Sequence, residues 1–204
     1  MAAAWWMMFP LTDSGPEWLE PYLLRGDAIR RGLVLFCLIV YAVRVTVTTL
    51  VFLKRKFPWA EAFIITVWMT FALLAFARVG GSNPQPMGLL EIIGLALFLS
   101  GSYLNTWSEY HRQRFKADPA TQGRLYTEGL FRLSRHVNYF GDVVLFSGLA
   151  LVTGRLVMLV IPLIMALNFI LFFIPRQEAY LANKYGPQFQ DYAKRTRKFI
   201  PLIY

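Results

Sequence analysis

Cysteine and charge are both scarce in this sequence, and each scarcity excludes a class of protein. The 204 residues include one cysteine, Cys37, so the chain cannot form an intramolecular disulfide or a cysteine-based metal cluster. Charged residues make up only 16%, whereas hydrophobic residues make up 56% and the mean hydropathy is +0.44. A water-soluble core of this size could not absorb so much apolar sequence. The composition therefore excludes an ordinary soluble enzyme and predicts a membrane protein.

The sequence also lacks the patterns that bind metals or nucleic acids. Its two histidines, His111 and His136, lie far from any set of carboxylates, so we expect no metal site. The net charge of +9 would suggest nucleic acid in a soluble protein, but no nucleic-acid-binding module accompanies it. In a multi-spanning protein the same charge indicates basic cytoplasmic loops. We therefore expect membrane lipids, and no nucleic acid, among the partners.

Five apolar runs approach the length of about 20 residues that a helix needs to cross a bilayer. They are residues 33–53, 60–77, 87–107, 139–153 and 156–174. The fold that we predict is an all-α bundle of five transmembrane helices in one integral membrane domain. Residues 1–106 would supply three spans, and residues 107–204 a helical hairpin, turned at Gly154 and Arg155, and a tail.

The basic residues are distributed unevenly among the loops. Three lie at residues 54–56, six between residues 107 and 136, and six from residue 175 onward, which places fifteen on one side. The positive-inside rule then predicts a cytoplasmic C-terminus and an outside N-terminus, as in a bacterial inner-membrane protein. The start of the chain lacks the basic region of a signal peptide, and its Trp5, Trp6 and Phe9 suit the membrane interface.

Two charged residues fall within the predicted spans. Arg44 lies near the middle of the first span, where a charge costs about 2.5 to 3.5 kcal/mol, so it should face the bundle or a wet cavity. Glu91 lies one turn into the third span and could be its partner. We favour a structural role for Glu91, because this end of the span would face away from the cytoplasm.

The most informative stretch lies where the fourth span begins. If the helix starts near Ser134, then Arg135, Asn138 and Asp142 stand at i, i+3 and i+7 and share one stripe, with Tyr139 beside them. Asp142 lies a turn inside the apolar segment, where an unpaired carboxylate is expensive, so it should have a partner or a ligand. A structural pair between Arg135 and Asp142 would explain the pattern equally well.

The tail after the fifth span carries a second polar motif. Arg176 and Glu178 follow Pro175 directly, and the hairpin would return them to the level of residues 135–142. Glu178 and Tyr185 would share a helix face, and Gly186 followed by proline would end that helix. A further basic run is more typical of attraction to anionic lipid headgroups than of a ligand site. It consists of Lys194, Arg195, Arg197 and Lys198.

Residues 129–142 read Gly-Leu-Phe-Arg-Leu-Ser-Arg-His-Val-Asn-Tyr-Phe-Gly-Asp, and Glu178 and a closing Tyr-Gly, Tyr, Ile-Pro pattern follow. This half of the chain, about residues 105–204, resembles a membrane superfamily. That superfamily joins isoprenylcysteine carboxyl methyltransferases and phospholipid methyltransferases to sterol (C14/C7) reductases and steroid 5-alpha-reductases. The family usually has proline after the histidine, where this chain has Val137.

The resemblance implies different cofactors for the two branches. In the reductases an Arg-His-Pro-Asn-Tyr-x-Gly-Asp/Glu motif helps to bind NADPH, and residues 138–142 match it. Residues 176–178, Arg-Gln-Glu, are closer to the Arg-Asp-Glu of sterol reductases than to the Glu-Glu of methyltransferases, which use S-adenosylmethionine. The ending at Tyr204 also resembles that of the sterol reductases. Against this, the chain is short, as small methyltransferases are, and its first half lacks a recognisable steroid-reductase donor motif.

The leading hypothesis is therefore an oxidoreductase in which NADPH reduces a carbon–carbon double bond of a lipophilic sterol-like or isoprenoid substrate taken from the bilayer. The alternatives are methyl transfer from S-adenosylmethionine and a non-enzymatic membrane protein. The sequence has no Gly-x-Gly-x-x-Gly motif, so a cofactor would lie between helix ends and loops. The resemblance implies Tyr139 and Asp142 as catalytic residues, and as cofactor-binding residues Arg132, Arg135, His136, Asn138, Tyr139, Gly141, Asp142, Arg176, Glu178, Tyr185 and Tyr192.

Overall fold

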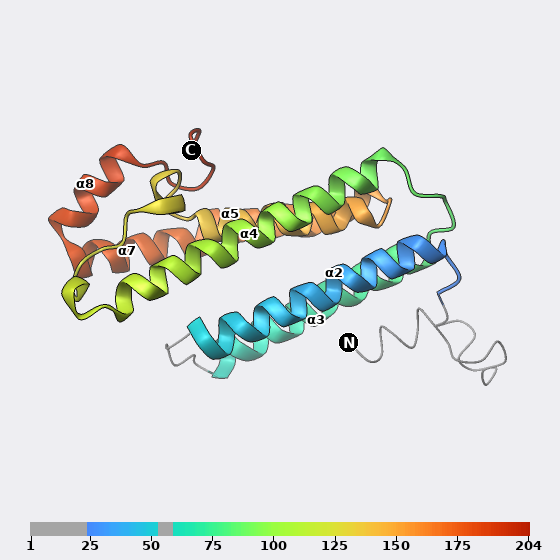
Figure 1. Cartoon of the computed structure of the whole chain (residues 1–204), viewed down its shortest axis with the longest axis horizontal. Helices are drawn as coiled ribbons and strands as arrows, with labels where there is room; N and C mark the ends of the chain where they lie inside the picture. The colour runs from blue at the N-terminus through green and yellow to red at the C-terminus, as the bar shows by residue number, and fades with distance from the viewer. Residues whose placement is uncertain (1–23, 53–58) are drawn as a thin grey trace. The chain divides into compact units, whose positions relative to one another are not determined.

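The structure is a computed structural model that describes residues 24–52 and 59–204 (Figure 1). These residues form helices and turns, and the described part of the chain contains no strand. The prediction of an all-α membrane fold is therefore confirmed. The interfacial aromatics expected at Trp5, Trp6 and Phe9, and the basic triplet at residues 54–56, lie outside the described residues.

The helices follow the apolar runs of the sequence. In chain order they are α2 (Ala28–Val47), α3 (Trp59–Ser82), α4 (Leu89–Ala117), α5 (Val137–Val152), α6 (Val160–Asn168), α7 (Ile174–Tyr185) and α8 (Pro187–Arg195). Two π-helical segments extend them, η2 (Thr48–Phe52) after α2 and η6 (Phe169–Phe173) between α6 and α7. Three short 3-10 helices lie in the connections, namely η3 (Pro119–Thr121), η4 (Gly129–Arg132) and η5 (Leu156–Leu159).

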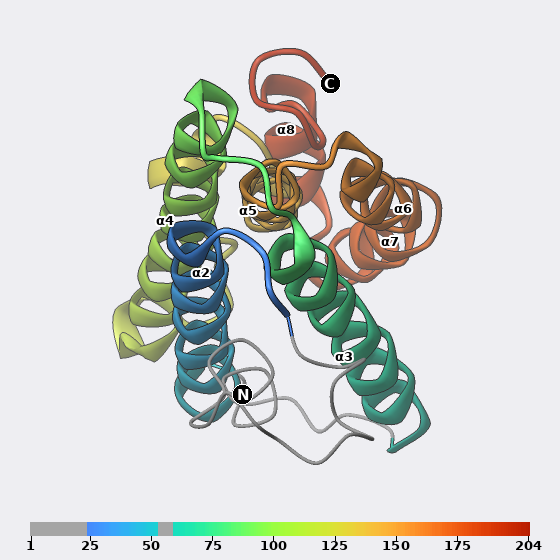
Figure 2. The same cartoon turned by 90° about the vertical axis from the view of Figure 1, so that its right-hand side faces the viewer.

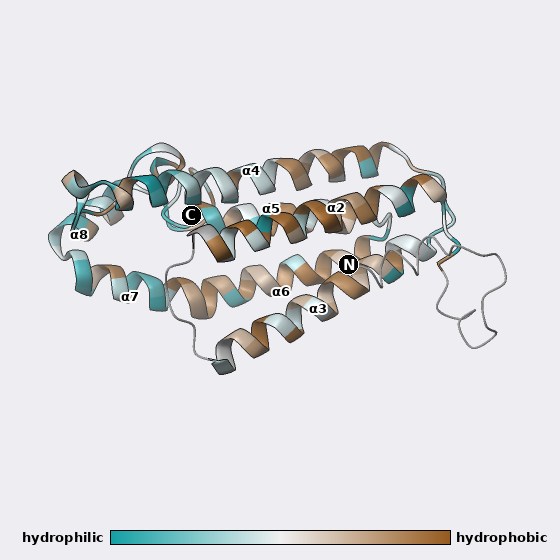
Figure 3. Cartoon of the chain, turned by 60° about the horizontal axis from the view of Figure 1, so that its bottom comes forward, coloured by the Kyte–Doolittle hydropathy of each residue, from teal (hydrophilic) through white to brown (hydrophobic). Residues whose placement is uncertain are grey.

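Four of the five expected spans are long and apolar enough to cross a membrane. They are Ala28–Leu50, Ala62–Ser82, Leu89–Ala117 and Leu156–Tyr185. The remaining span, α5, has 16 residues and rises about 24 Å, less than the roughly 30 Å of a bilayer core. The last span changes character along its length, because α6 is mostly hydrophobic and α7 is mostly hydrophilic, as is α8 after it (Figure 3).

The chain divides into two compact units. The first comprises Met1–Phe98 with Ser147–Ile161, and the second Leu99–Phe146 with Pro162–Tyr204, so α4 and α5 contribute to both. Within the first unit, α2 packs against α3 (Figure 2). Its core includes Val34 and Leu38 of α2 and Phe76 of α3, all at most 1% exposed.

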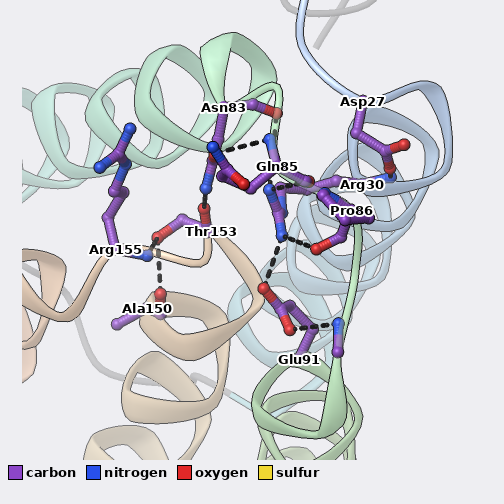
Figure 4. Close-up of polar contacts among 10 residues, drawn as sticks. Asp27, Arg30, Asn83, Gln85, Pro86, Glu91, Ala150, Thr153 and Arg155 are labelled. Atoms are coloured by element: carbon purple, nitrogen blue, oxygen red, sulfur yellow. Dashed lines mark hydrogen bonds and ion pairs between the residues drawn. The ribbon is translucent and has the colours of Figure 1, made fainter.

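A buried polar cluster in the first unit joins the first turns of α2 and α4 to the connections that follow α3 and α5 (Figure 4). Arg30, only 1% exposed, places a guanidinium nitrogen 2.5 Å from Glu91 and donates to the Gln85 carbonyl at 2.8 Å. The Asn83 amide donates to the Thr153 carbonyl at 3.0 Å. The structural role expected for Glu91 is therefore confirmed, but its partner is Arg30 and not Arg44, because Arg30 lies at the same end of the helices.

Helices α4 and α5 approach one another closely at glycines. In the second unit a Cβ atom added to Gly101 would lie 2.3 Å from the Leu145 nitrogen and 2.5 Å from the Gly141 carbonyl oxygen. In the first unit a Cβ at Gly94 would lie 2.8 Å from the Gly148 carbonyl oxygen. Small residues at such positions let membrane helices pack backbone to backbone. The contact at Gly101 holds the first half of α5 beside the middle of α4.

Candidate functional site

The candidate site lies in the second unit, where the chain enters α5. The helix begins at Val137, three residues later than the sequence predicts, so Arg135 precedes it and does not share a helical stripe with Asn138. The physical reason is that this backbone is hydrogen-bonded elsewhere: the Arg135 N–H donates to the Arg197 carbonyl at 2.8 Å, and the His136 N–H to the Ser134 hydroxyl at 3.2 Å. Such local side-chain acceptors delay the start of a helix.

Val137, which replaces the usual proline of the superfamily, anchors this turn. Its side chain is fully buried in a core cluster with Phe131, Phe189 and Tyr192. The Tyr192 hydroxyl donates to the Phe131 carbonyl at 2.6 Å, and burial raises the pKa of that tyrosine. Tyr185 packs against the same cluster. Packing therefore fixes the turn without the rigidity that proline would supply.

Arg135 and Glu178 form the central ion pair of the site. The guanidinium donates to Glu178 Oε1 from Nε at 2.8 Å, and its Nη2 lies 2.7 Å from the same oxygen. The other terminal nitrogen, Nη1, donates to the carbonyls of Ala193, at 3.1 Å, and Thr196. Both side chains are mostly buried, at 7% and 19% exposed. Arg135 thus joins the start of α5, helix α7 and the segment after α8.

His136 extends this pair toward Tyr139. Its Nε2 lies 3.3 Å from Glu178 Oε1, and its ring stacks on Tyr139 at 5.6 Å between centroids. Tyr139 in turn stacks on Phe169 of η6 at 4.7 Å. Burial lowers the pKa of His136, and the nearby Glu178 carboxylate opposes that shift only in part. The imidazole is therefore neutral at pH 7.

Asn138 is held by two residues of α4 that the sequence reasoning missed. Its amide donates to Glu109 Oε1 at 2.9 Å, and its carbonyl accepts from the Asn105 amide at 3.0 Å. Glu109 also pairs with Arg112. The positions 105, 109 and 112 share one helix face, so extending the predicted third span past residue 107 would have brought them together. The Asn105 Oδ1 atom is buried and has no hydrogen-bond partner.

The remaining predicted site residues lie at different depths. Gly141 faces α4 so closely that a Cβ would come within 2.8 Å of the Asn105 nitrogen. Asp142 is half-buried on α5, whereas Arg132 and Arg176 are exposed. The structure thus brings Arg135, His136 and Glu178 into direct contact.

Comparison with characterised proteins points to sterol and steroid reductases. The chain is 29% identical over 154 residues to a Delta(14)-sterol reductase of Ascobolus immersus, covering 68% of this chain and 36% of that protein. It is 28% identical over 111 residues to 3-oxo-5-alpha-steroid 4-dehydrogenase 2 of Rattus norvegicus, covering 54% and 42%. A shorter match, 39% over 64 residues, links it to a probable O-methyltransferase of Ustilaginoidea virens, covering 31% and 22%.

These matches confirm the resemblance seen in the sequence, although the chain spans well under half the length of each relative. The profile of one family, described as a protein of unknown function (DUF1295), matches residues 47–196. That match begins far earlier than residue 105, so the relationship includes helices of the first half as well. Because the profile covers well over half of the chain, this protein belongs to the DUF1295 family.

Proposed function

We propose that this protein is a membrane reductase that uses NADPH to reduce a carbon–carbon double bond of a sterol-like or isoprenoid substrate. One observation carries the proposal: the two motifs that resemble those of sterol reductases, around Arg135 and Glu178, meet in a buried ion pair although 43 residues separate them. The similarity to sterol and steroid reductases supports the same reaction class.

The donor set around this pair fits a dinucleotide. The contacts that Glu178 makes with Arg135 and His136 use Oε1, so Oε2 can accept from a ribose hydroxyl. Arg135 already directs four contacts at its protein partners, so the phosphates would fall to the exposed Arg132 and Arg176. An arginine recognises a phosphate through charge-assisted hydrogen bonds. Asn138, Tyr139, Gly141 and Asp142 would complete the site from α5, with Tyr185 and Tyr192 supporting it from α7 and α8.

Bound NADPH would supply a hydride to one carbon of the double bond. The protein must then deliver a proton to the other carbon, so that two hydrogens are added in total. Tyr139 and Asp142 are the candidates for this acid, because both lie in the first two turns of α5 and Tyr139 stacks on His136, which contacts Glu178. The stacking of Tyr139 between His136 and Phe169 fixes its ring, so its hydroxyl has a defined position from which to donate.

A second candidate function is methyl transfer from S-adenosylmethionine to a lipid or to a prenylcysteine carboxylate. The match to a probable O-methyltransferase favours it, because the identity of 39% over 64 residues is higher than the identity to either reductase named above. In that case Glu178 would accept from the ribose or the amino group. Arg176 would matter little, because S-adenosylmethionine carries no phosphate.

The two candidates can be separated by cofactor binding to the purified protein. NADPH and S-adenosylmethionine are added separately, and the melting temperature is recorded for each. A ligand at 100 times its dissociation constant stabilises the folded state by about 2.7 kcal/mol, which is a measurable shift. Stabilisation by NADPH alone supports the reductase, stabilisation by S-adenosylmethionine alone supports the methyltransferase, and no shift with either contradicts both.

An arginine variant sharpens this test. Arg176→Ala should weaken NADPH binding by about 1.5 to 3 kcal/mol, the range for a hydrogen bond to a charged group. The matched control is Arg155→Ala, since Arg155 is also exposed but lies in the turn between α5 and η5. Equal NADPH affinity in both variants would exclude Arg176 from the site.

A further inference from the structure

The segment after α8, residues 196–204, folds back over the start of α5 (Figure 1), and we call it the C-terminal strap. Its Phe199 is buried and packs edge to face on Phe140, in the first turn of α5. The two ring centroids are 6.0 Å apart. The Leu202 N–H lies 3.5 Å from the Leu133 carbonyl. Because α5 enters its apolar run at this point, the strap lies at the level where the helix meets the membrane surface.

The end of the strap exposes apolar side chains outside any membrane-crossing helix. Leu202 is 76% exposed, Ile203 74% and Tyr204 46%. Leu202 has a positive φ of 65°, a conformation that non-glycine residues rarely adopt, so the backbone is turned sharply here. Exposure of such a group of apolar side chains to water is unfavourable. A surface of this kind is typical of contact with an apolar phase such as a membrane.

Basic residues border this apolar tip. Arg197 is exposed, and the Lys198 ammonium lies 5.6 Å from the centre of the Tyr204 ring. Cations beside an apolar and aromatic edge match the membrane interface, where phosphates lie just above the acyl chains. This charge pattern fits an anionic lipid surface.

We propose that the C-terminal strap docks on anionic lipid headgroups, with Arg197 and Lys198 contacting phosphates and the side chains of residues 202–204 entering the interface. The proposal is independent of the reaction that the protein catalyses. It also links the membrane surface to the ion pair, because the strap accepts hydrogen bonds from Arg135 at the carbonyls of Thr196 and Arg197. The Ser134 hydroxyl donates to the Phe199 carbonyl of the same strap at 2.7 Å.

The test places an environment-sensitive fluorophore on the tip. The full chain carries Leu202→Cys in a Cys37→Ala background and is reconstituted in vesicles of phosphatidylcholine, with or without 30% phosphatidylglycerol (about one lipid in three). We expect the fluorescence emission to shift to shorter wavelength, and aqueous iodide to quench it less, only in the vesicles that contain anionic lipid. One basic residue near an anionic surface is worth about a fivefold change in affinity, so Arg197→Gln with Lys198→Gln should weaken docking about 25-fold.

The matched control removes the same charge from elsewhere in the unit, by Arg114→Gln with Arg124→Gln, and should keep the response to anionic lipid. The proposal is overturned if the fluorophore reports the same environment in both vesicles, or if the control variant loses the response as fully as the strap variant does. A response to inorganic phosphate alone, without anionic lipid, would also overturn it. If a variant fails to fold, hydrogen exchange of the backbone amides of residues 196–204 in the unsubstituted chain gives the same comparison. We then expect slower exchange only in the vesicles that contain anionic lipid.

Discussion

Arg135 and Glu178, which lie 43 residues apart in the sequence, form an ion pair with a nitrogen–oxygen distance of 2.7 Å. Helix α5 carries the chain away from this level, and the continuous helix from Leu156 to Tyr185 returns it. Since Arg135 also binds the carbonyls of Ala193, in the last turn of α8, and Thr196, directly after it, this pair connects three segments of the chain. The same contact is the centre of the proposed cofactor site, and we expect it to stabilise the fold.

Loss of the carboxylate at this pair should destabilise the protein. Glu178→Gln leaves the guanidinium of Arg135, 7% exposed, without a charged partner, and breaking a buried pair in this way costs about 3 kcal/mol. The free energy of unfolding in mixed micelles measures the effect. The control is Glu128→Gln, because Glu128 is exposed. If both variants unfold alike, the pair contributes nothing to stability.

The Arg30–Glu91 pair should give a non-additive double-mutant cycle. Glu91→Leu alone leaves Arg30 buried and unpaired, and also removes the acceptor for the Gly88 N–H at 2.8 Å, so we expect a loss of about 3 to 5 kcal/mol. Arg30→Met with Glu91→Leu should recover part of this loss, because two apolar side chains leave no unpaired charge. Unfolding of the wild type, both single variants and the double variant measures the coupling, and strictly additive losses would contradict it.

The glycine contact between α4 and α5 should not tolerate a methyl group. Gly101→Ala forces a Cβ to within 2.3 Å of backbone, so α5 must shift, and we expect a loss of about 1 to 3 kcal/mol. Gly32→Ala is the control, since a Cβ there meets nothing within 4 Å and alanine favours a helix by about 0.8 to 1 kcal/mol. The melting temperatures of the two variants should therefore shift in opposite directions from that of the wild type. Shifts in the same direction would count against close packing at Gly101.

Stability should fall as the pH drops below about 6.5 because of His136. Burial lowers the pKa of its imidazole in the folded state, whereas the unfolded chain has the ordinary value of 6.5. Between 6.5 and the lower folded pKa the unfolded state binds more protons, so stability is full above 6.5 and is lost as the pH falls. One proton gives at most about 1.4 kcal/mol per pH unit.

The pH effect is measured by comparing the unfolding of the wild type and His136→Gln between pH 5 and pH 8. The difference in the free energy of unfolding between the two proteins should be constant above pH 7 and shrink in the acid range, because only the wild type carries the imidazole. A difference that does not change with pH would show that His136 has the same pKa in both states.

The sequence by itself determined the class of fold and the residues of interest. Composition and apolar runs gave an all-α membrane protein with helices close to their observed positions, because burial in lipid requires long apolar segments whatever their packing. The motif at residues 129–142 and Glu178 identified the superfamily before any contact was known. The break after Tyr185 also followed from local chemistry, since Gly186 has a φ of 50° and proline follows it.

Only the tertiary structure decided which of these residues meet. Helical spacing placed Arg135 and Asn138 on one stripe, but backbone bonds to the strap delay the helix until Val137, and the two side chains bind Glu178 and Glu109 instead. Arg30 looked like a loop charge, yet it is buried because Glu91 of α4 and the carbonyls of the connection between α3 and α4 surround its guanidinium (Figure 4). Such contacts depend on where helix ends lie in space, and a pattern along one helix carries no information about that.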